Sequence, residues 1–373
     1  MKKFIDLFAG SGGLSLGFEQ AGFTPIFAND INGICQKTYL HNHKNMSKEN
    51  YFLGDINILN ENIDNYKNKF KEVEVVCGGP PCQGFSMANR QRINDDPRNN
   101  LYKAYLMFLQ KIRPPFFIME NVKGMLPHID EILHDFNIYL NYEYSVGYSV
   151  LNAIDFGVPQ NRERLVFIGN RLGINSNNIV SDIQRIKKKR YTLFDAIGDL
   201  PSLKPNKTKN KTYLENKDIG YSKRDFTYKR TNFYNFINNN TDVHFLFNHK
   251  NRYNNDRDIE IYSRLPQGCN SLDDSISDIM PYKSRAMIFK DKYFKLKYDE
   301  PCKTITAHMR FDCNMYIHPT QARGLSPREA ARVQTFPDSY EFLGTPNNWY
   351  QQIGNAVPVK LAKEIGEYIA KCL

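Results

Sequence analysis

Through about residue 170 the chain alternates short apolar runs with longer amphipathic segments, and this alternation narrows the choice of folds more than any other feature. The strand-length runs are Phe4–Phe8, Thr24–Ala28, Val73–Cys77, Phe116–Met119, Tyr144–Asn152 and Leu165–Ile168. The helix-length segments between them, with apolar residues at helical spacing, include Leu14–Ala21, Leu101–Ile112 and Ile129–Leu140. Strands that alternate with helices predict an α/β fold, a doubly wound and mostly parallel sheet with helices on both faces.

Residues suited to binding follow several of these strands. A glycine turn comes after Phe8, and Asp30 lies just past the second run. Cys82 and Glu120 follow two later runs. Ligands of such sheets bind at the carboxyl ends of the strands, so we expect these groups to share one cleft.

The first of these segments, Asp6-Leu7-Phe8-Ala9-Gly10-Ser11-Gly12-Gly13-Leu14, predicts a strand, a glycine turn and the start of a helix. Glycines allow a ligand to approach the backbone, and the helix N-terminus offers free N–H groups. Ser15 stands where a dinucleotide motif needs its third glycine, and the Gly-Lys-Ser/Thr of a phosphate loop is absent. Alone, the turn also fits a tight connection that binds nothing.

Two acidic residues make the turn more informative. Asp30, at the end of the second strand, can accept hydrogen bonds from ribose hydroxyls. Asp55 is suited to an adenine amino group, with Ile56 against the ring. Each aspartate alone is more typical of a turn or a helix cap. Together with the glycine turn they predict a pocket for a nucleoside without a pyrophosphate, and S-adenosylmethionine is such a molecule.

The segment Gly78-Gly79-Pro80-Pro81-Cys82-Gln83-Gly84-Phe85-Ser86 puts a cysteine on a stiff loop after an apolar strand. Glycines let the backbone turn sharply there, and prolines restrict it. A cysteine needed only for packing would lie inside an apolar run, as Cys77 does. The position of Cys82 therefore predicts a sulfur that is directed at a substrate.

Two further polar segments flank strands. Glu120-Asn121-Val122 follows one, and a carboxylate at the edge of an apolar strand is suited to hold or donate a proton. Gln160-Asn161-Arg162-Glu163-Arg164 precedes another. Side chains two apart in an extended segment share a face, so Gln160, Arg162 and Arg164 are expected to point together. Three donors on one face suit an anion or the oxygen atoms of a base, although a solvated strand edge would look the same.

The composition limits the class of protein. A chain of 373 residues, 41% of them hydrophobic, can hold one large domain or two ordinary ones. Seven cysteines without a CxxC pair predict neither a disulfide framework nor a zinc site, and they favour a reducing compartment. No apolar stretch has the length of a signal peptide or a membrane span, so we expect a cytoplasmic protein that binds no membrane.

The second half of the chain differs from the first in its residue pattern and its charge. The balance of 50 Lys+Arg against 40 Asp+Glu gives +10, which points weakly to a polyanionic partner, although AT-rich codons would also enrich lysine. Much of the excess lies between Arg185 and Lys250. From about Tyr191 the alternation fades, which is compatible with disorder, but recurring Tyr and Phe favour a loop-rich second domain. Helix-like segments follow at Pro327–Val333 and Val359–Cys372.

Taken in order, these segments resemble the motifs of the cytosine-5 DNA methyltransferases of bacterial modification systems, and the resemblance extends over the whole chain. The matching residues are Phe8, Gly10 and Gly12; Asp30; Asp55; Pro80-Pro81-Cys82; Glu120-Asn121-Val122; Gln160, Arg162 and Arg164; Arg323 to Gln334; and Gln352 to Pro358. Any one of these could arise by chance, but all of them in the family's order are specific.

The resemblance implies two domains. Residues 1–190 plus 346–373 would form a catalytic and cofactor-binding domain with the Rossmann-like fold of S-adenosylmethionine-dependent methyltransferases. Residues 191–345 would form a smaller, loop-rich target-recognition domain and hinge. S-adenosylmethionine would be the methyl donor, and no metal would be needed. Besides the glycine turn and the two aspartates, the residues expected to line its pocket are Ile31, Ile56, Pro80, Leu101 and Asn355.

The resemblance also implies a mechanism. Cytosine carbon 5 is a poor nucleophile, and addition of a thiolate to carbon 6 activates it. The thiolate would come from Cys82, Glu120 would bond ring nitrogen 3 and the amino group, and Arg162 with Arg164 would orient the base. The group that removes the carbon-5 proton stays open, with water as one candidate. Because carbon 6 is inaccessible in a duplex, base flipping is expected.

The implied partner is double-stranded DNA with a short specific site, and the family allows a cognate restriction endonuclease for the same site. We expect a monomer in a bacterial or phage-infected cytoplasm. One alternative is a transfer-RNA cytosine methyltransferase, which the long basic segment Tyr191–Gln321 disfavours. Another is a non-catalytic DNA-binding module, which the intact Cys82 and Glu120-Asn121-Val122 disfavour.

Overall fold

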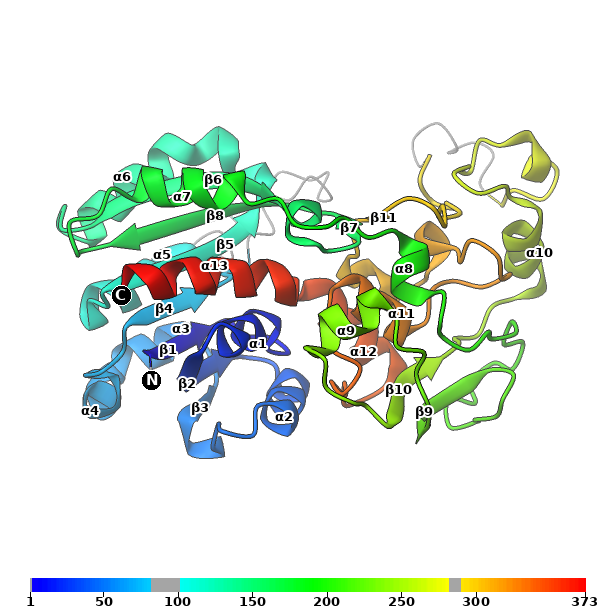
Figure 1. The fold of residues 1–373 in the computed structure, drawn as a ribbon, viewed down its shortest axis with the longest axis horizontal. Coiled ribbons are helices and arrows are strands. Elements are labelled where there is room, and N and C mark those ends of the chain that lie inside the picture. The colour runs from blue at the N-terminus through cyan, green and yellow to red at the C-terminus, as the bar shows by residue number, and fades with distance from the viewer. Residues whose placement is uncertain (1, 82–100, 282–289) are drawn as a thin grey trace. The chain divides into compact units, whose positions relative to one another are not determined.

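A computed structural model describes residues 2–81, 101–281 and 290–373 (Figure 1). The chain divides into two compact units. The first comprises Met1–Gly157, Glu163–Lys189 and Val357–Leu373, and the second Val158–Arg162 and Arg190–Ala356. Residues 346–356, which the sequence analysis assigned to the catalytic domain, fall in the second unit.

A seven-stranded sheet forms the centre of the first unit, in the order β3-β2-β1-β4-β5-β8-β6. Its strands are β1 (Lys2–Leu7), β2 (Phe23–Asp30), β3 (Tyr51–Leu53), β4 (Val75–Gly78), β5 (Phe116–Val122), β6 (Ser145–Asn152) and β8 (Glu163–Asn170). The neighbours from β3 to β5 are parallel, and β8 pairs antiparallel with both β5 and β6. The predicted mostly parallel α/β sheet is confirmed.

Six of these strands coincide with the predicted apolar runs, to within a few residues at each end. Strand β3 was not predicted from the sequence. This strand has only three residues and pairs only with β2 at the edge of the sheet. So short an edge strand leaves no apolar run long enough to recognise.

Helices cover both faces of the sheet. They are α1 (Gly13–Gln20), α2 (Gly33–Asn42), α3 (Ile56–Glu61), α4 (Lys67–Phe70), α5 (Leu101–Ile112), α6 (Ile129–Tyr139), α7 (Ser176–Arg185) and α13 (Val359–Cys372). Alternate residues of β1 point to opposite faces of the sheet. Ile5 and Leu7 join a core with α5, whereas the Phe4 ring packs 5.5 Å from that of Phe18 in α1. This alternation is what a strand buried on both sides requires.

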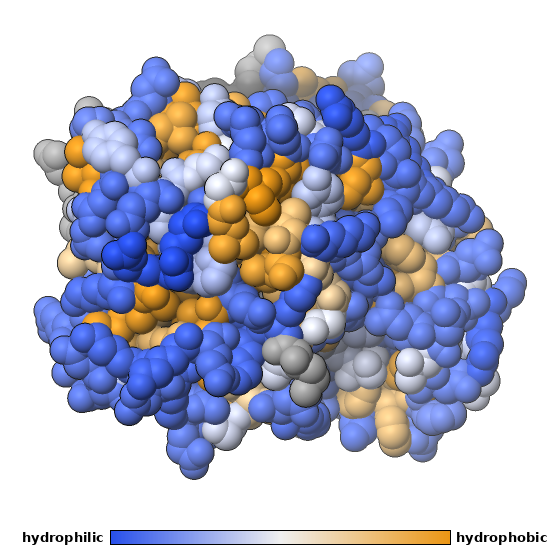
Figure 2. All heavy atoms as spheres, turned by 60° about the vertical axis from the view of Figure 1, so that its left-hand side comes forward, coloured by the Kyte–Doolittle hydropathy of each residue, from blue (hydrophilic) through white to orange (hydrophobic). Residues whose placement is uncertain are grey.

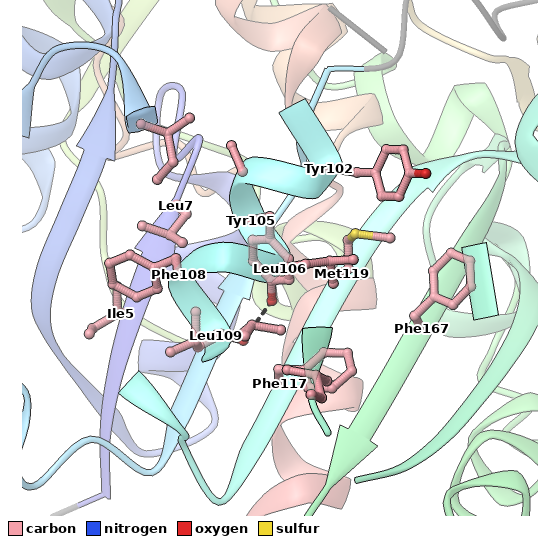
Figure 3. Close-up of a cluster of buried hydrophobic side chains, with 14 of the residues drawn as sticks. Ile5, Leu7, Tyr102, Tyr105, Leu106, Phe108, Leu109, Phe117, Met119 and Phe167 are labelled. Carbon is pink, nitrogen blue, oxygen red and sulfur yellow. Dashed lines mark hydrogen bonds between the residues drawn. The ribbon is translucent and has the colours of Figure 1, made fainter. Parts of the chain in front are cut away.

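The main core lies under α5 (Figure 3). Leu106, Phe108 and Leu109 of this helix are fully buried within it. The hydroxyl of Tyr105 reaches down to the sheet, 3.0 Å from the carbonyl oxygens of both Val76 and Ile118. The helix is therefore fixed to β4 and β5, the two strands whose ends carry the predicted catalytic residues.

The C-terminal helix α13 belongs to the first unit and packs against α1. At Gly17 of α1 an added Cβ would lie only 2.4 Å from the Cβ of Ala362. The close approach of the two helices therefore requires a glycine there. The face of the molecule turned forward in Figure 2 is largely hydrophilic, with apolar side chains gathered in patches. No helix in the described ranges combines the length and apolar character needed to cross a membrane.

The described part of the second unit consists of short elements joined by loops. Its elements are β7 (Gln160–Asn161), α8 (Leu193–Ile197), β9 (Gly220–Asp225), α9 (Asn232–Asn238), β10 (Phe245–Lys250), α10 (Asp256–Arg264), β11 (Cys302–Lys303), α11 (Pro327–Val333) and α12 (Pro346–Asn355), besides short 3-10 turns. The two sheets formed by these strands have two strands each, β10 with β9 and β11 with β7.

Buried arginines from the segment Arg323 to Gln334 hold this unit together. Arg323 forms two hydrogen bonds to Glu329, at 2.6 and 2.7 Å, and both side chains are almost fully buried. Arg332 binds Asp338 and Asp199. Burial alone would raise the pKa of Glu329, but Arg323 more than offsets it and holds that pKa well below its usual range. Buried ion pairs therefore connect segments of this unit that its two small sheets do not join.

We predict that Glu329→Gln lowers the free energy of unfolding by about 3–5 kcal/mol, because it leaves the buried Arg323 charge without its counter-ion. Urea denaturation of both proteins measures the change. Glu300→Gln is the control, since Glu300 forms an exposed pair with Lys297 and should change stability by less than about 1 kcal/mol. Equal effects of the two substitutions would contradict the role given to the buried pair.

Candidate active site

The turn after β1 has the backbone conformation that its glycines predict. Gly10 and Gly12 have φ of 54° and 86°, and Phe8 also has a positive φ of 56°. A Cβ added at Gly10 would meet no atom within 4 Å, so open space adjoins the backbone there. Positive φ and open space together fit a turn that a ligand approaches closely.

Asp30, at the end of β2, ties this turn to the neighbouring strand. Its carboxylate accepts hydrogen bonds from the backbone N–H groups of Gly10 and Asn32, each at 2.8 Å. Burial raises the pKa of Asp30, and these two bonds oppose that rise. The bond to Gly10 gives Asp30 a role in shaping the glycine turn that the sequence analysis did not foresee.

Two isoleucines were predicted to line the cofactor pocket, and they differ in exposure. Ile31 directly follows β2, and its side chain is 72% exposed. Ile56 is 2% exposed and belongs to the main core. As the first residue of α3 it still offers its backbone N–H. Asp55 caps that helix, accepting from the N–H of Asn57 at 2.8 Å.

The remaining predicted cofactor residues lie at the ends of elements. The carbonyl oxygen of Pro80, after β4, accepts a hydrogen bond from the side-chain amide of Asn121 at 2.9 Å. Leu101 begins α5 and packs partly buried against the main core. Asn355 is the exposed last residue of α12, in the second unit.

Glu120 and Arg164 form an ion pair across β5 and β8. The Arg164 Nε donates to Glu120 Oε1 at 2.8 Å, and each side chain is 14% exposed. A Cβ added at Gly79 would lie 3.2 Å from Glu120 Oε2, so this carboxylate lies against the backbone of the loop after β4. Cys82, three residues further along that loop, lies outside the described residues.

Of the three side chains expected to point together, Gln160 and Arg162 both bond the backbone of Ile305, whereas Arg164 pairs with Glu120. Arg162 is buried in the second unit, where it donates to the carbonyl oxygens of Ile305 at 2.6 Å and Ala356 at 3.2 Å. Gln160 accepts from the N–H of Ile305 at 2.7 Å. The extended alternation breaks because β7 ends at Asn161 and β8 begins at Glu163, so Arg162 falls between two strands.

The described cysteines are poor candidates for a nucleophile. Cys35, Cys77, Cys269, Cys302, Cys313 and Cys372 are free thiols, the first two and Cys302 and Cys313 being buried. Burial raises the pKa of Cys35 and of Cys302 to about 12, and that of Cys77 well above its usual value. A thiol acts as a nucleophile only when ionised. No group of three or more His, Cys, Asp or Glu side chains in the described part of the chain could hold a metal.

A buried polar network beneath the glycine turn escaped the sequence analysis. Asp6 of β1 is 1% exposed and accepts a hydrogen bond from the Ser15 hydroxyl at 2.6 Å. The Tyr39 hydroxyl lies 2.7 Å from the same Ser15 oxygen. Burial raises the pKa of Asp6 to about 7. Ser15, noticed only because it breaks a dinucleotide motif, was the available signal.

Comparison with known proteins settles the family. The model of C-5 cytosine-specific DNA methylases matches residues 2–371. The chain belongs to that family. It is a DNA (cytosine-5) methyltransferase, with DNA as substrate and S-adenosylmethionine as the family's methyl donor.

Relatives resemble the chain over nearly its whole length. It is 33% identical over 378 residues to the type II methyltransferase M1.HphI of Haemophilus parahaemolyticus, which covers 99% of this chain and 86% of the relative. It is also 33% identical over 390 residues to M.DdeI of Desulfomicrobium norvegicum, covering 98% and 88%. These shares leave no large part of the chain without a counterpart.

Two solved structures share the fold. A prophage-encoded E. coli protein assigned as a DNA modification methyltransferase superposes with a TM-score of 0.76 at 26% identity, covering 100% of this chain and 99% of that one. The S. pombe Dnmt2 methyltransferase superposes with a TM-score of 0.54 at 17% identity, covering 100% and 99%. The second likeness concerns the fold alone.

We predict that Asp6→Asn flattens the pH dependence of stability. Since the pKa of Asp6 rises from 3.8 to about 7 on folding, the native state holds a proton that the unfolded state releases between these values. The contribution of Asp6 to stability therefore falls as pH rises through this window and is constant above it. Relative to wild type, the variant should gain roughly 3 kcal/mol between about pH 5 and about pH 8. Urea denaturation across this range tests it, and parallel pH profiles would disprove it.

Proposed function

We propose that this protein methylates carbon 5 of a flipped-out cytosine within a short duplex DNA sequence, through a covalent bond to Cys82. We further propose that it is the modification arm of a restriction–modification system. The observation that carries the proposal is the Glu120 carboxylate, held by Arg164 and lying against Gly79, three residues before Cys82. A carboxylate beside the loop that leads to Cys82 fits the attack of its thiolate on a cytosine ring.

The chemistry needs a nucleophile that both adds and leaves. The Cys82 thiolate forms a bond to carbon 6, and the electron pair of the 5,6 double bond becomes available at carbon 5. S-adenosylmethionine, when bound, would supply the methyl group to which carbon 5 forms its new bond, and the cofactor's sulfur would leave as a neutral thioether with the electron pair of the broken bond. Loss of the carbon-5 proton to a base then restores the double bond as the carbon–sulfur bond breaks, and the thiolate is regenerated.

Glu120 stabilises the base during this attack. Its carboxyl group accepts a hydrogen bond from the exocyclic amino group of cytosine and shares a proton with nitrogen 3, which offsets the negative charge that addition at carbon 6 creates. Arg164 keeps the carboxylate in position through its 2.8 Å bond to Oε1, while Oε2 faces the loop after β4. Arg162 is assigned to orienting the base. Its contacts with the carbonyl oxygens of Ile305 and Ala356 would hold the guanidinium in place for that role.

The glycine turn and the end of β2 fit S-adenosylmethionine. The open space at Gly10 leaves room beside the backbone, and Phe8, Gly10 and Gly12 shape the turn. Ile31 presents an exposed apolar side chain, which suits an adenine face. Asp30 retains lone pairs for ribose hydroxyls beyond its two backbone bonds.

Further cofactor contacts are assigned to residues at element ends. Asp55 is given the adenine amino group, and Ile56 contributes its backbone N–H. Pro80, Leu101 and Asn355 complete the proposed pocket.

The second unit is proposed to recognise the target sequence. It contains the basic runs found from Arg190 onward, and the predicted catalytic residues apart from Arg162 lie elsewhere. The relatives M1.HphI and M.DdeI are type II methyltransferases, which supports a restriction–modification context, a cognate endonuclease and a specific site in DNA rather than transfer RNA. A monomer suffices for this reaction, since one chain carries every assigned group.

Cys82 is predicted to be the nucleophile. Cys82→Ser should abolish methylation, measured by bisulfite sequencing of duplex DNA, while S-adenosylmethionine binding measured by calorimetry persists. Duplex DNA containing 5-fluorocytosine should form a covalent adduct with the wild type, because fluorine cannot leave as a proton does. Peptide mapping of that adduct to another cysteine, with Cys77→Ser as the control variant, would overturn the assignment.

Glu120→Gln is predicted to slow the chemical step by about 10²–10³-fold, because the amide keeps the shape but cannot supply a proton as negative charge develops at nitrogen 3. DNA affinity should change much less. Single-turnover methylation and equilibrium DNA binding, measured on the same variant, separate the two effects. Glu163→Gln is the control, since Glu163 forms an exposed pair with Lys123. A Glu120→Gln variant that methylates normally once saturated with DNA would refute the role.

A further inference from the structure

We propose that the ribbon formed by β9 and β10 enters the major groove of the target DNA, and that Arg224 on β9 is a specificity-determining residue. This inference rests on the proposed function and adds to it the residue that reads a base. It assigns a guanine contact to Arg224 and a phosphate contact to its neighbour Lys223.

The strands β9 and β10 lie side by side as a two-stranded ribbon (Figure 1), and they differ in burial. On β10, Leu246 is 1% exposed, and Asn248 exchanges two hydrogen bonds with the backbone of Phe342 at 2.9 and 3.0 Å. On β9, by contrast, only Gly220 is buried. A two-stranded ribbon fits the major groove of B-DNA, so an anchored ribbon with a free outer strand has a suitable shape.

Aromatic rings hold the two cations of β9. The guanidinium of Arg224 lies 5.5 Å from the ring of Tyr221 and 5.3 Å from that of Phe226. The ammonium of Lys223 lies 4.6 Å from the ring of Phe245 and 5.2 Å from that of Phe247. Such contacts fix the orientation of a cation without neutralising its charge.

Three other cations of the same unit form ion pairs with carboxylates. Lys204 pairs with Asp218, and Arg230 with Asp242. Lys250 pairs with Glu215. Within the described residues neither Lys223 nor Arg224 forms an ion pair or a side-chain hydrogen bond. Their charge and their N–H donors therefore stay available to an anionic partner.

The two cations suit different parts of a duplex. A guanidinium fixed in orientation offers two parallel N–H groups that match the O6 and N7 acceptors of guanine. An exposed ammonium is a point charge that suits a phosphate. Basic residues on an edge strand also discourage strand pairing between molecules. That simpler role, however, requires no aromatic rings around the cations.

The test compares variants on one DNA library. Wild type, Arg224→Ala and Lys223→Ala methylate the library, and bisulfite sequencing reports which sites are modified. Arg224→Ala should lose discrimination at one position of the site, by about 5- to 150-fold against the other bases. Lys223→Ala should keep the site but bind more weakly at all sequences, with a smaller salt dependence.

Two further variants keep the test decisive. Arg185→Ala removes an exposed guanidinium from α7 in the first unit and should leave the site unchanged. Arg224→Lys keeps the charge but not the paired N–H groups. It should relax the site as Arg224→Ala does, and it carries the test if the alanine variant fails to fold.

The outcomes separate the inference from the proposed function. A wild-type protein that methylates no cytosine would refute the function itself. A wild type with a defined site, together with Arg224 variants that keep the same site and the same discrimination at every position, would overturn the inference alone.

Discussion

The alignment of β1, β4 and β5 at the centre of the sheet decides where the predicted site residues of the first unit lie. Leu7 pairs with Gly78, and Gly78 pairs with Met119, so β1 and β4 end at the level of Met119, and β5 continues from there to Val122. The next residues along the chain are Phe8, Gly79 and Glu120. The glycine turn, the loop that leads to Cys82 and the carboxylate therefore begin side by side, as the carboxyl ends of parallel strands require.

This alignment depends on a glycine at position 78. A Cβ there would lie 2.7 Å from the carbonyl oxygen of Leu7 and 3.1 Å from the ring of Tyr105. The Tyr105 hydroxyl in turn lies 3.0 Å from carbonyl oxygens on β4 and β5. The packing of α5 onto the sheet and the alignment of the strands therefore both depend on Gly78. A larger residue at this position would disturb both.

The sequence predicted the central strands well because each is buried on both faces and appears as an apolar run. The same reasoning failed where a side chain's surroundings come from distant parts of the chain. The alternation through Gln160, Arg162 and Arg164 suggested one face, but a break between β7 and β8 leaves Arg164 with Glu120 and Arg162 with Ile305. The network of Asp6, Ser15 and Tyr39 joins three elements, and no local pattern predicts such a contact.

The motif from Arg323 to Gln334 illustrates a related limit. It was recognised as a family signature, and its polar residues turned out to be structural. Arg323, Arg332 and Gln334 are fully buried, with Gln334 donating to the carbonyl oxygens of Ile353 and Ala356. A charged residue that belongs to a family's sequence motif need not contact the substrate. A unit rich in loops also needs buried polar contacts, because these hold its loops in place.

Charge compensation distinguishes these structural arginines from one suited to binding. Arg332 lies 5.3 Å from the Tyr228 ring, much as Arg224 lies near Tyr221, but it also binds Asp199 and Asp338. Arg252 stacks on a ring too, and its N–H groups bind backbone carbonyls. A ring near an arginine is therefore no sign of function by itself. The informative case is a guanidinium that aromatic rings hold in place and whose N–H groups have no acceptor among the described residues. Only that arrangement leaves N–H donors that can form hydrogen bonds with a partner.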